Sequence, residues 1–262
     1  MHPMLKTAIS AARLAARIIL MHLDRLDRLE ITAKGRSDYV TQVDREAENA
    51  ILDTITRVYP GHSILAEESG IKTGDDYTWI IDPLDGTTNF IHGYPQFGVS
   101  IAVSHRDRLE HSVVFDPLRD ELFTASRGEG ARLNDRRIRV SRIQHLDQSL
   151  LGTGFPVRAI ERIDPWLKTF RALLPKASGI RRPGAAAIDL AHVAAGRFDG
   201  FWEMALQPWD MAAGVLLIRE AGGLVADFNG GQDFLQSGDI VAANPSIFNE
   251  LLRIIHDRSH AG

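Results

Sequence analysis

The first segment of the chain carries apolar residues at the spacing of an α-helix. These positions step by three and four residues: Leu5, Ile9, Ala12, Ala16, Ile19 and Leu23. Such spacing places one apolar stripe along a helix, so we predict a helix that packs against the core. Because Arg13 and Arg17 interrupt the apolar run, it is typical of neither a signal peptide nor a membrane span. We therefore expect a cytoplasmic protein with no membrane partner.

A second helix is predicted to begin at Thr41. Thr41 and Asp44 have the spacing of an N-terminal capping box. A helical stripe follows at Ala47, Ile51, Ile55 and Val58. Pro60 and Gly61 then end the pattern.

Short runs rich in β-forming residues follow this helix. The expected strands cover residues 64–66, 79–82, 97–105, 109–118, 120–128 and 136–141. The first two end in the carboxylates of Glu67 and Asp82. The polar turns between the next three predict an antiparallel meander, and residues 127–135 predict a hairpin loop.

From about residue 146 the pattern changes to strands that alternate with helices. The expected strands are 149–155, 198–204, 224–228 and 239–244, and the expected helices are 166–174, 184–198, 207–223 and 247–255. We therefore predict layered sheets and helices in one compact unit with two joined halves, an α+β half over residues 1–145 and an α/β half over residues 146–262.

Composition excludes several classes of function. The 262 residues include 34 acidic and 30 basic side chains, so no basic excess indicates nucleic-acid binding by the fold as a whole. The chain contains no cysteine, which excludes disulfides, thiolate catalysis and cysteine-ligated metal centres. Its ten histidines show no HExxH spacing, so a zinc pair of that kind is absent too.

The segment WIIDPLDGTTNF, residues 79–90, ends a buried strand with two carboxylates. Asp82 and Asp85 lie three residues apart, and Pro83 fixes the chain direction between them. A buried carboxylate without a positive partner costs several kcal/mol or takes up a proton, and this segment has no lysine or arginine. A turn could aim both carboxylates and the Leu84 carbonyl at one point. Hard oxygen ligands of this kind suit Mg²⁺.

Gly86, Thr87 and Thr88 follow directly. Backbone amides at the start of a turn or helix bind phosphate. Carboxylates for a metal beside amides for a phosphate suit metal-assisted phosphoryl transfer, in which divalent ions withdraw charge from the ester and lower the pKa of a water. The structural alternative is that D-P-x-D-G forms only a turn, in which Asp and Gly serve the backbone geometry.

Three further acidic residues could join the two aspartates. Glu67 and Glu203 end predicted strands, and Asp210 begins a predicted helix. Taken alone, Glu67 is typical of a solvated loop and Asp210 of a helix cap. Their separation in the sequence does not prevent convergence, and their spacing does not establish it.

Three segments together resemble the inositol monophosphatase family: WIIDPLDGTTNF, AEES around Glu67, and QPWDMAAGVLLIREAGG around Asp210. The similarity extends from residue 38 to residue 244 and is greatest to a bacterial branch of the family. It implies a layered α-β-α-β-α sandwich, a homodimer, and magnesium-dependent hydrolysis of small phosphate monoesters that is inhibited by Li⁺.

The resemblance also implies roles for individual residues. The implied ligands of two or three Mg²⁺ ions, for which Mn²⁺ could substitute, are Glu67, Asp82, the Leu84 carbonyl, Asp85 and Asp210. Thr87 and Glu67 would orient the attacking water, and Asp44 would support the threonine. The implied substrate contacts are the amides of Gly86 and Thr87 for the phosphate, and Gly184, Ala186, Glu203 and Asp210 for the rest of the molecule. Lys34 and Asp38 match a loop near the metals.

Several functions remain open within this resemblance. The leading one is an inositol-phosphate phosphatase acting on myo-inositol 1-phosphate or a related polyol monophosphate, while relatives favour fructose 1,6-bisphosphate, 3′-phosphonucleotides or histidinol phosphate. An aspartyl-phosphatase motif, D-x-D-x-T, does not fit, because Asp82 and Asp85 are separated by two residues instead of one. Some bacterial members also bind transcription factors and assist antitermination during the transcription of ribosomal RNA. Arg181 and Arg182 could contact such a partner, the substrate or the other subunit, or could form a solvated turn.

Overall fold

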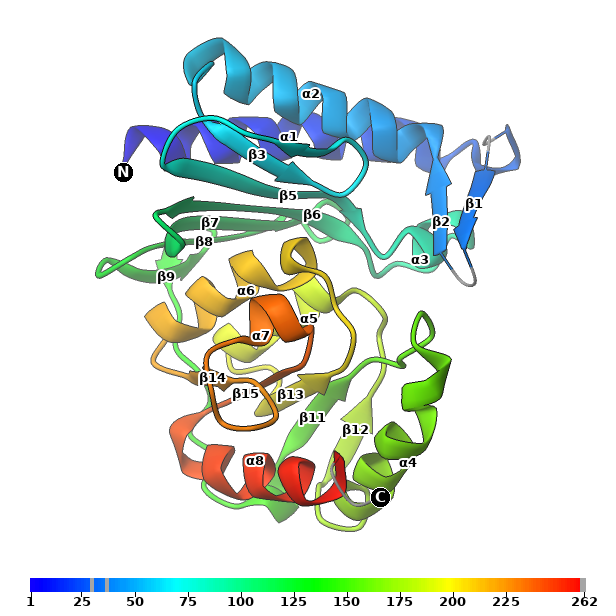
Figure 1. The fold of residues 1–262 in the computed structure, drawn as a ribbon, viewed down its shortest axis with the longest axis vertical. Coiled ribbons are helices and arrows are strands. Elements are labelled where there is room, and N and C mark those ends of the chain that lie inside the picture. Colours follow the sequence, from blue (N-terminus) through cyan, green and yellow to red (C-terminus); the bar gives the residue numbers. More distant parts are fainter. Residues whose placement is uncertain (29–30, 36–37, 260–262) are drawn as a thin grey trace.

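The computed structural model describes residues 1–28, 31–35 and 38–259, which fold into five layers (Figure 1). The helices of these layers are α1 (Pro3–Leu23), α2 (Gln42–Val58), α4 (Ile163–Leu173), α5 (Ala186–Ala194), α6 (Pro208–Glu220) and α8 (Pro245–Ser259). The pair α1 and α2 covers one face of a larger sheet, α5 and α6 lie between the two sheets, and α4 and α8 cover the outer face of the smaller sheet. This arrangement confirms the expected α-β-α-β-α sandwich.

The larger sheet has eight strands and is mainly antiparallel. Its order is β10 (Arg136–Arg137), β9 (Gly130–Leu133), β8 (Glu121–Ser126), β7 (Arg108–Asp116), β6 (Gly98–His105), β5 (Tyr77–Asp85), β3 (Ser63–Ala66) and β4 (Gly70–Lys72). The meander of β6, β7 and β8 is confirmed. Only β3 and β5 pair in parallel, with Ala66 opposite Ile81. The next residues along the two strands, Glu67 and Asp82, therefore lie side by side.

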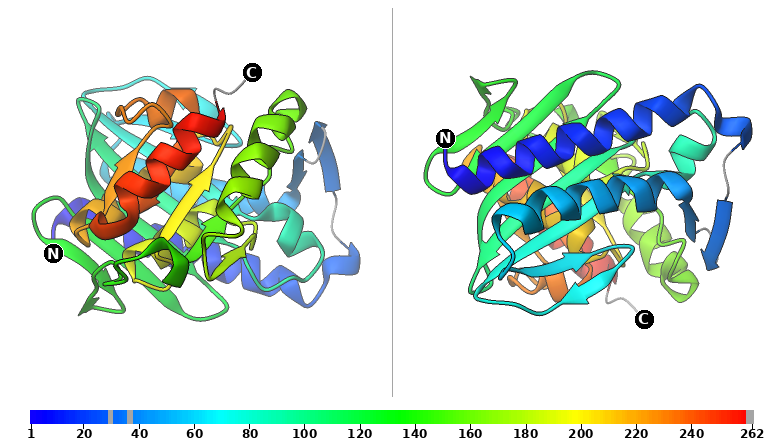
Figure 2. Two further views of the ribbon diagram at one scale, coloured as in Figure 1. Left: turned by 90° about the horizontal axis from the view of Figure 1, so that it is seen from below. Right: turned by 90° about the horizontal axis from the view of Figure 1, so that it is seen from above.

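The first two helices bury the stripes that the sequence predicts. They lie side by side across the larger sheet (Figure 2). In α2 the predicted capping box is present. The Thr41 hydroxyl accepts a hydrogen bond from a backbone N–H of the first helical turn, and the Asp44 carboxylate accepts one from the Thr41 N–H. One position of the stripe was wrong: Val58, the last residue of α2, is 55% exposed.

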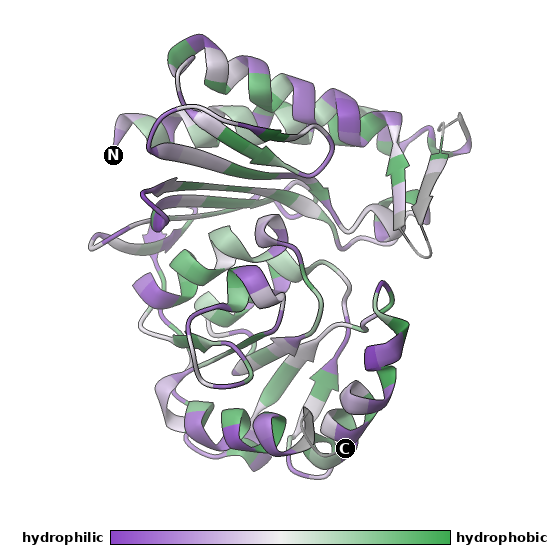
Figure 3. Cartoon of the chain, viewed as in Figure 1, coloured by the Kyte–Doolittle hydropathy of each residue, from purple (hydrophilic) through white to green (hydrophobic). Residues whose placement is uncertain are grey.

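The smaller sheet has five strands and lies in the lower half of the molecule in Figure 1. Its order is β12 (Gly179–Arg181), β11 (Leu150–Thr153), β13 (Gly200–Glu203), β15 (Ile240–Ala243) and β14 (Leu224–Ala226). Strand β11 is parallel to both of its neighbours, whereas β15 is antiparallel to β13 and β14. The helices α5 and α6 are mostly apolar around their circumference (Figure 3), as is expected of a layer that packs on both sides.

Short elements account for most differences from the predicted pattern. The strand expected over 136–141 is limited to β10, and the loop expected over 127–135 contains β9. Six short strands and α-helices were not predicted: β1 (Ile31–Gly35), β2 (Asp38–Thr41), β4, α3 (Thr87–Ile91), β12 and α7 (Phe234–Ser237). Arg181 ends β12 and is not part of a turn. None of the helices in the described part of the chain has both the length and the apolar character needed to cross a membrane.

The two central helices approach each other closely at Gly214 of α6. A Cβ atom built there would overlap the Leu190 side chain of α5, whose Cδ1 would lie only 2.8 Å away. Both helices are buried in the same apolar cluster, so Leu190 cannot move towards solvent. The separation of the two helices is therefore fixed by a glycine.

We expect Gly214→Ala to destabilise the fold. Alanine favours a helix interior over glycine by about 0.5–1 kcal/mol, but overpacking costs about 1–3 kcal/mol. The net loss of stability should therefore be about 1 kcal/mol. Urea denaturation followed by circular dichroism measures it. Gly61→Ala is a matched control, because a Cβ there would lie 3.7 Å from its nearest neighbour, Asp75. Equal midpoints for the two variants would contradict the prediction.

Candidate metal centre and phosphate pocket

Three aspartates from two distant segments meet where β5 ends and α6 begins. Asp82 and Asp85 come from β5, and Asp210 comes from the first turn of α6. One carboxylate oxygen of each lies within 4.8 Å of the others. Their side chains are buried, with residue exposures of 1%, 8% and 8%. The spacing of these residues in the sequence could not establish that they converge, although the family resemblance implied it; the structure brings the three together.

A β-bulge aims Asp82 and Asp85 in the same direction. Neighbouring residues of a strand point to opposite faces, so residues three apart would normally diverge. Here Asp82 pairs with Ser100 and Asp85 with Gly98, which leaves one extra residue in β5 between the two pairs. A bulge of this kind re-aims side chains. The strand therefore continues through Pro83 as a bulge, where the sequence had predicted a turn.

Asp85 acts as the N-terminal cap of a helix that lies a hundred residues further along the chain. Its Oδ2 accepts a hydrogen bond from the Ala187 N–H at 2.8 Å, in the first turn of α5. No side chain of α5 itself caps this end. Backbone hydrogen bonds from Ala186 and Ile188 also favour the ionised form of Asp85. The helix thus orients the carboxylate as a ligand and receives its cap in return.

Asp210 caps α6 in a similar way. Its Oδ2 accepts a hydrogen bond from the Gln207 N–H at 2.8 Å, and Pro208 occupies the first helical turn. The Ser100 hydroxyl of β6 donates to the Trp209 carbonyl at 3.1 Å and attaches this end of the helix to the sheet. The capping role that the sequence suggested for Asp210 is therefore present together with its place in the acidic cluster.

Mutual repulsion makes this cluster unfavourable without a cation. Burial raises the pKa of Asp82 well above its usual range, and the charges of Glu67, Asp85 and Asp210 raise it further. Burial raises the pKa of Asp85 to about 7, and Asp210 adds to the shift. A divalent ion would remove this repulsion. Because the cluster offers only oxygen atoms, the residues present fit Mg²⁺ or Mn²⁺.

Glu67 belongs to the same centre. It shares a hydrogen bond with Asp82, which also raises the pKa of Asp82. The Glu67 N–H donates to the Ile81 carbonyl at 3.2 Å, so the parallel pairing of β3 with β5 fixes its place. Arg158 lies 4.0 Å from Glu67 across the opening.

Thr87 begins α3 and is attached to the second helix of the chain. Its hydroxyl lies 2.9 Å from Asp44 Oδ1 and 3.0 Å from the Leu84 carbonyl. Asp44 is fully buried, and its other oxygen accepts the hydrogen bonds of the Thr41 capping box. Burial raises the pKa of Asp44, and these hydrogen bonds oppose the rise. Asp44 therefore supports Thr87, as the resemblance implied.

Gly86 is required by the backbone at this point. Its φ of 87° lies in the left-handed region, and a Cβ there would lie 2.8 Å from the Gln96 carbonyl oxygen and 3.2 Å from the Ala185 Cβ. Gly86 and the first residues of α3, Thr87 and Thr88, line the cavity, and amides of a first helical turn have no partner within the helix.

One cavity of about 280 Å³ connects these groups. The predicted site residues that line it are Glu67, Asp82, Leu84, Asp85, Gly86, Thr87, Gly184, Ala186, Glu203 and Asp210. Asp44 lies behind Thr87 and does not line it. Burial raises the pKa of Glu203 to about 8, although the charge of Arg182 opposes the rise. The side chains of Lys34 and Asp38 lie outside the described residues.

The sequence analysis missed one wall of this cavity. Residues 155–158, directly after β11, line it and contribute Arg158. Gly154 was expected to belong to the strand over 149–155, but β11 ends at Thr153, and a Cβ at Gly154 would overlap the Glu203 carboxylate. Arg182, whose guanidinium lies 4.7 Å from the Phe155 ring centre, also lines the cavity. The position of the loop at a strand end was the available signal, because such loops often carry function.

Without metal, the protein should lose stability as the pH rises from about 5 to 8. Unfolded carboxyl groups ionise near pH 4, whereas in the folded state Asp85 keeps its proton up to a pKa of about 7 and Glu203 up to a pKa of about 8. The folded state then binds more protons than the unfolded state, so the free energy of unfolding falls with rising pH. We expect a lower Tm in EDTA at pH 8 than at pH 5.5.

The effect of Mg²⁺ should show the opposite trend. Added Mg²⁺ should raise the Tm more at pH 8, because it then displaces fewer protons from its ligands. Thermal scans in EDTA and in Mg²⁺ at both pH values test this, with Asp85→Asn as the variant whose Mg²⁺ response should shrink. A Tm in EDTA that rises between pH 5.5 and 8 would count against the acidic cluster as described.

Comparison with known proteins agrees with this geometry. A sequence profile of the inositol monophosphatase family matches residues 1–260. The chain is 54% identical over 261 residues to the Nus factor SuhB of Pseudomonas aeruginosa, a match that covers 97% of this chain and 96% of the relative. The crystal structure of the extragenic suppressor protein SuhB from Bartonella henselae matches with a TM-score of 0.94 and 44% identity, over 97% of this chain and 98% of that one.

A further structure, of the inositol monophosphatase from Anabaena (Nostoc) sp. PCC 7120, matches with a TM-score of 0.84 and 39% identity, over 97% of this chain and 96% of that one. The profile match over residues 1–260 includes both sheets, the central helices and every residue that lines the cavity. The chain therefore belongs to the inositol monophosphatase family.

Proposed function

We propose that this protein is a magnesium-dependent phosphatase that hydrolyses myo-inositol 1-phosphate, or a related polyol monophosphate, to the polyol and phosphate. The observation that carries the proposal is that Asp82, Asp85 and Asp210 meet in a cavity that also contains the start of α3. Groups suited to a metal and groups suited to a phosphate thus border the same space. A relative of the same fold that is called inositol monophosphatase supports the choice of substrate.

The residues that would hold the metal ions are those that surround the acidic cluster. They are Glu67, Asp82, the Leu84 carbonyl, Asp85 and Asp210, for two Mg²⁺ ions or three. When bound, divalent ions supply the positive charge that stabilises a phosphate ester under attack and lowers the pKa of water. Their charge would also relieve the repulsion that raises the pKa of Asp82.

Thr87 would position the attacking water. Its single hydroxyl proton is directed to Asp44 or to the Leu84 carbonyl, because both are acceptors within hydrogen-bonding distance. The lone pairs of the same oxygen are then left to accept a hydrogen bond from a water in the cavity. Glu67, which lines the same cavity, would accept the proton that this water loses. Thr87 is therefore a positioning group and not the nucleophile.

The two ends of the cavity would recognise different parts of the substrate. Amides of Gly86 and Thr87 would bind the phosphate at the start of α3. Glu203, with the turn that contains Gly184 and Ala186, would bind the polyol hydroxyls. Because burial raises the pKa of Glu203 to about 8, its carboxyl group could donate as well as accept a hydrogen bond near neutral pH.

Asp85→Asn should abolish phosphatase activity while the protein stays folded. The amide keeps the size of the side chain and can still accept the hydrogen bond from Ala187, but it removes one negative metal ligand. We expect at least about a 100-fold loss of kcat/KM, in line with the loss of a group on which metal catalysis depends. Phosphate release from myo-inositol 1-phosphate in Mg²⁺, with and without Li⁺, is the measurement.

The matched control is Asp53→Asn, an exposed aspartate of α2 far from the cavity. It should keep full activity and show inhibition by Li⁺. The same assay with fructose 1,6-bisphosphate, a 3′-phosphonucleotide and histidinol phosphate tests the substrate class. Full activity in folded Asp85→Asn, or no release from any of these esters by the wild-type protein, would overturn the proposal.

A second function is favoured by the name of a relative. The protein from Pseudomonas aeruginosa that is 54% identical to this chain is called a Nus factor, so we propose a surface-mediated role with transcription antitermination factors as an alternative. Arg181 supports it, because this exposed arginine ends β12, the edge strand of the smaller sheet. Arg182 is less suitable as a surface contact, because it lines the cavity.

The two roles should separate by mutation. Arg181→Glu should weaken binding to purified RNA polymerase and Nus factors, since it reverses a surface charge, and should leave phosphate release within about two-fold. Asp85→Asn should keep the partner and lose turnover. Pull-down with immobilised variants, followed by the phosphate assay on the same preparations, measures both. If the wild-type protein retains no transcription factor, the regulatory role has no support.

A further inference from the structure

We propose that Gln96 and Asp189 are a positioning pair that holds the start of α5 on the Asp85 carboxylate and thereby sets the affinity of the acidic cluster for divalent cations. The proposal rests on the metal site of the proposed function. It concerns two residues that do not touch the cluster themselves. Both are buried, with exposures of 5% and 1%.

Asp85 depends on the placement of α5 for its hydrogen bonds. The Ala187 N–H reaches Asp85 Oδ2 at 2.8 Å, and no side chain of the helix competes for the amides of its first turn. A shift of α5 along its axis would therefore turn these amides away from the carboxylate. Hydrogen bonds around a metal-binding carboxylate fix its orientation, and their loss weakens metal binding.

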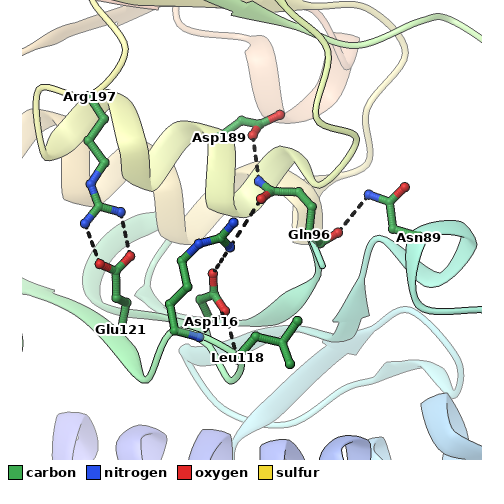
Figure 4. Close-up of polar contacts among 8 residues, drawn as sticks. Asn89, Gln96, Asp116, Leu118, Glu121, Asp189 and Arg197 are labelled. Carbon is green, nitrogen blue, oxygen red and sulfur yellow. Dashed lines mark hydrogen bonds and ion pairs between the residues drawn. The ribbon is translucent and has the colours of Figure 1, made fainter. Parts of the chain in front are cut away.

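Gln96 connects α5 to the larger sheet through its side-chain amide. Its Nε2 donates to Asp189 Oδ1 at 3.2 Å (Figure 4). Its Oε1 accepts from the Arg119 guanidinium at 3.4 Å. Arg119 is itself held by Asp116, which accepts from Nη1 at 2.5 Å. Glutamine suits this place because one end of its amide donates and the other accepts. The guanidinium of Arg119 can only donate, so it faces Oε1, and the carboxyl group of Asp189 faces Nε2; the two partners thus assign the oxygen and the nitrogen of the amide.

The backbone of Gln96 connects the same region to the pocket. Its carbonyl accepts a hydrogen bond from Asn89 Nδ2 at 2.7 Å, and the same Asn89 nitrogen lies 2.9 Å from the Pro183 carbonyl and 3.2 Å from that of Gly184 (Figure 4 shows the Asn89–Gln96 contact). A Cβ at Gly86 would lie 2.8 Å from the Gln96 carbonyl oxygen. Gln96 is therefore in contact with the segment after β5 and, through Asn89, with the turn that leads into α5.

A second connection on the same helix provides a comparison. Arg197, three residues beyond the end of α5, forms two hydrogen bonds of 2.5 Å with the Glu121 carboxylate of β8 (Figure 4). This ion pair joins the far end of the helix to the same sheet. It is more exposed than the Gln96–Asp189 pair, and it lies away from the amides that face Asp85. The two connections differ in their distance from the cluster, and only the first should affect metal binding.

Gln96→Met tests the proposal, because methionine matches glutamine in length and cannot form either hydrogen bond. We expect the affinity for Mn²⁺, measured by titration calorimetry of the metal-free protein, to fall about five-fold. That is less than the 10–100-fold found for groups that bond a metal ligand directly, since Gln96 acts one step further away. At saturating Mg²⁺, kcat for phosphate release should stay within about two-fold, while the Mg²⁺ concentration for half-maximal activity rises.

Glu121→Gln is the matched control. It should lower the Tm because it weakens the ion pair, and it should leave the affinity for Mn²⁺ unchanged. If both variants lose Tm and both lose affinity for Mn²⁺ in proportion, the effect is one of general stability and the proposal is wrong. Unchanged affinity in folded Gln96→Met also overturns it.

A reversed pair keeps the test informative if Gln96→Met does not fold. Gln96→Glu alone replaces the amide donor that faces Asp189 with a second buried carboxyl group and should weaken Mn²⁺ binding, although the contact with Arg119 is kept. Adding Asp189→Asn supplies a donor from the other side and should restore the affinity to within about two-fold of wild type. Failure of the double variant to restore it contradicts the proposal. Calorimetry needs no substrate, so these outcomes are distinct from a failure of the proposed phosphatase activity.

Discussion

Repulsion among buried carboxylates is the constraint on which the rest of this structure depends. Asp82, Asp85 and Asp210 lie within 4.8 Å of one another, and burial together with their mutual charge raises the pKa values of Asp82 and Asp85. Such an arrangement survives only where hydrogen-bond donors surround it or where a cation enters. The neighbouring elements supply the donors, and the cavity supplies the way in for a cation.

The donors come chiefly from the beginnings of helices. Asp44 caps α2, Asp85 receives amides of α5, and Asp210 caps α6. A helix N-terminus carries partial positive charge and unpaired N–H groups, so it stabilises a carboxylate even before a metal binds. The structural and the functional interpretations of Asp85 and Asp210 are therefore compatible, since each caps the beginning of a helix and also lines the cavity.

Each layer of the fold contributes different residues to the cavity. The larger sheet provides Asp82, Asp85 and, through the neighbouring strand, Glu67, while the smaller sheet provides Glu203 at the other end of the cavity. The middle layer of α5 and α6 joins the two and carries Asp210. Because the helices pack closely, with Gly214 against Leu190, the spacing between the acidic cluster and Glu203 is set by the packing of the core. A buried chain of polar contacts through Gln96 adds directional restraint to that packing.

The sequence by itself determined the helices, the meander and the candidate chemistry. Periodicity marks which side of an element is buried, so the stripe of α1 and the strands β6 to β8 could be predicted, whereas short pieces such as β12 and β10 carry too few residues to show a period. Asp82 and Asp85 could be recognised because they belong to one segment, and the family resemblance pointed to Glu67, Glu203 and Asp210. Only the tertiary structure decided how these acids meet. The bulge that aims Asp82 and Asp85 together depends on the pairing of β5 with β6, and the donors on Asp85 come from a helix a hundred residues away. A periodic pattern shows which face of an element is buried, but the neighbour that covers that face is chosen by the packing of the whole chain.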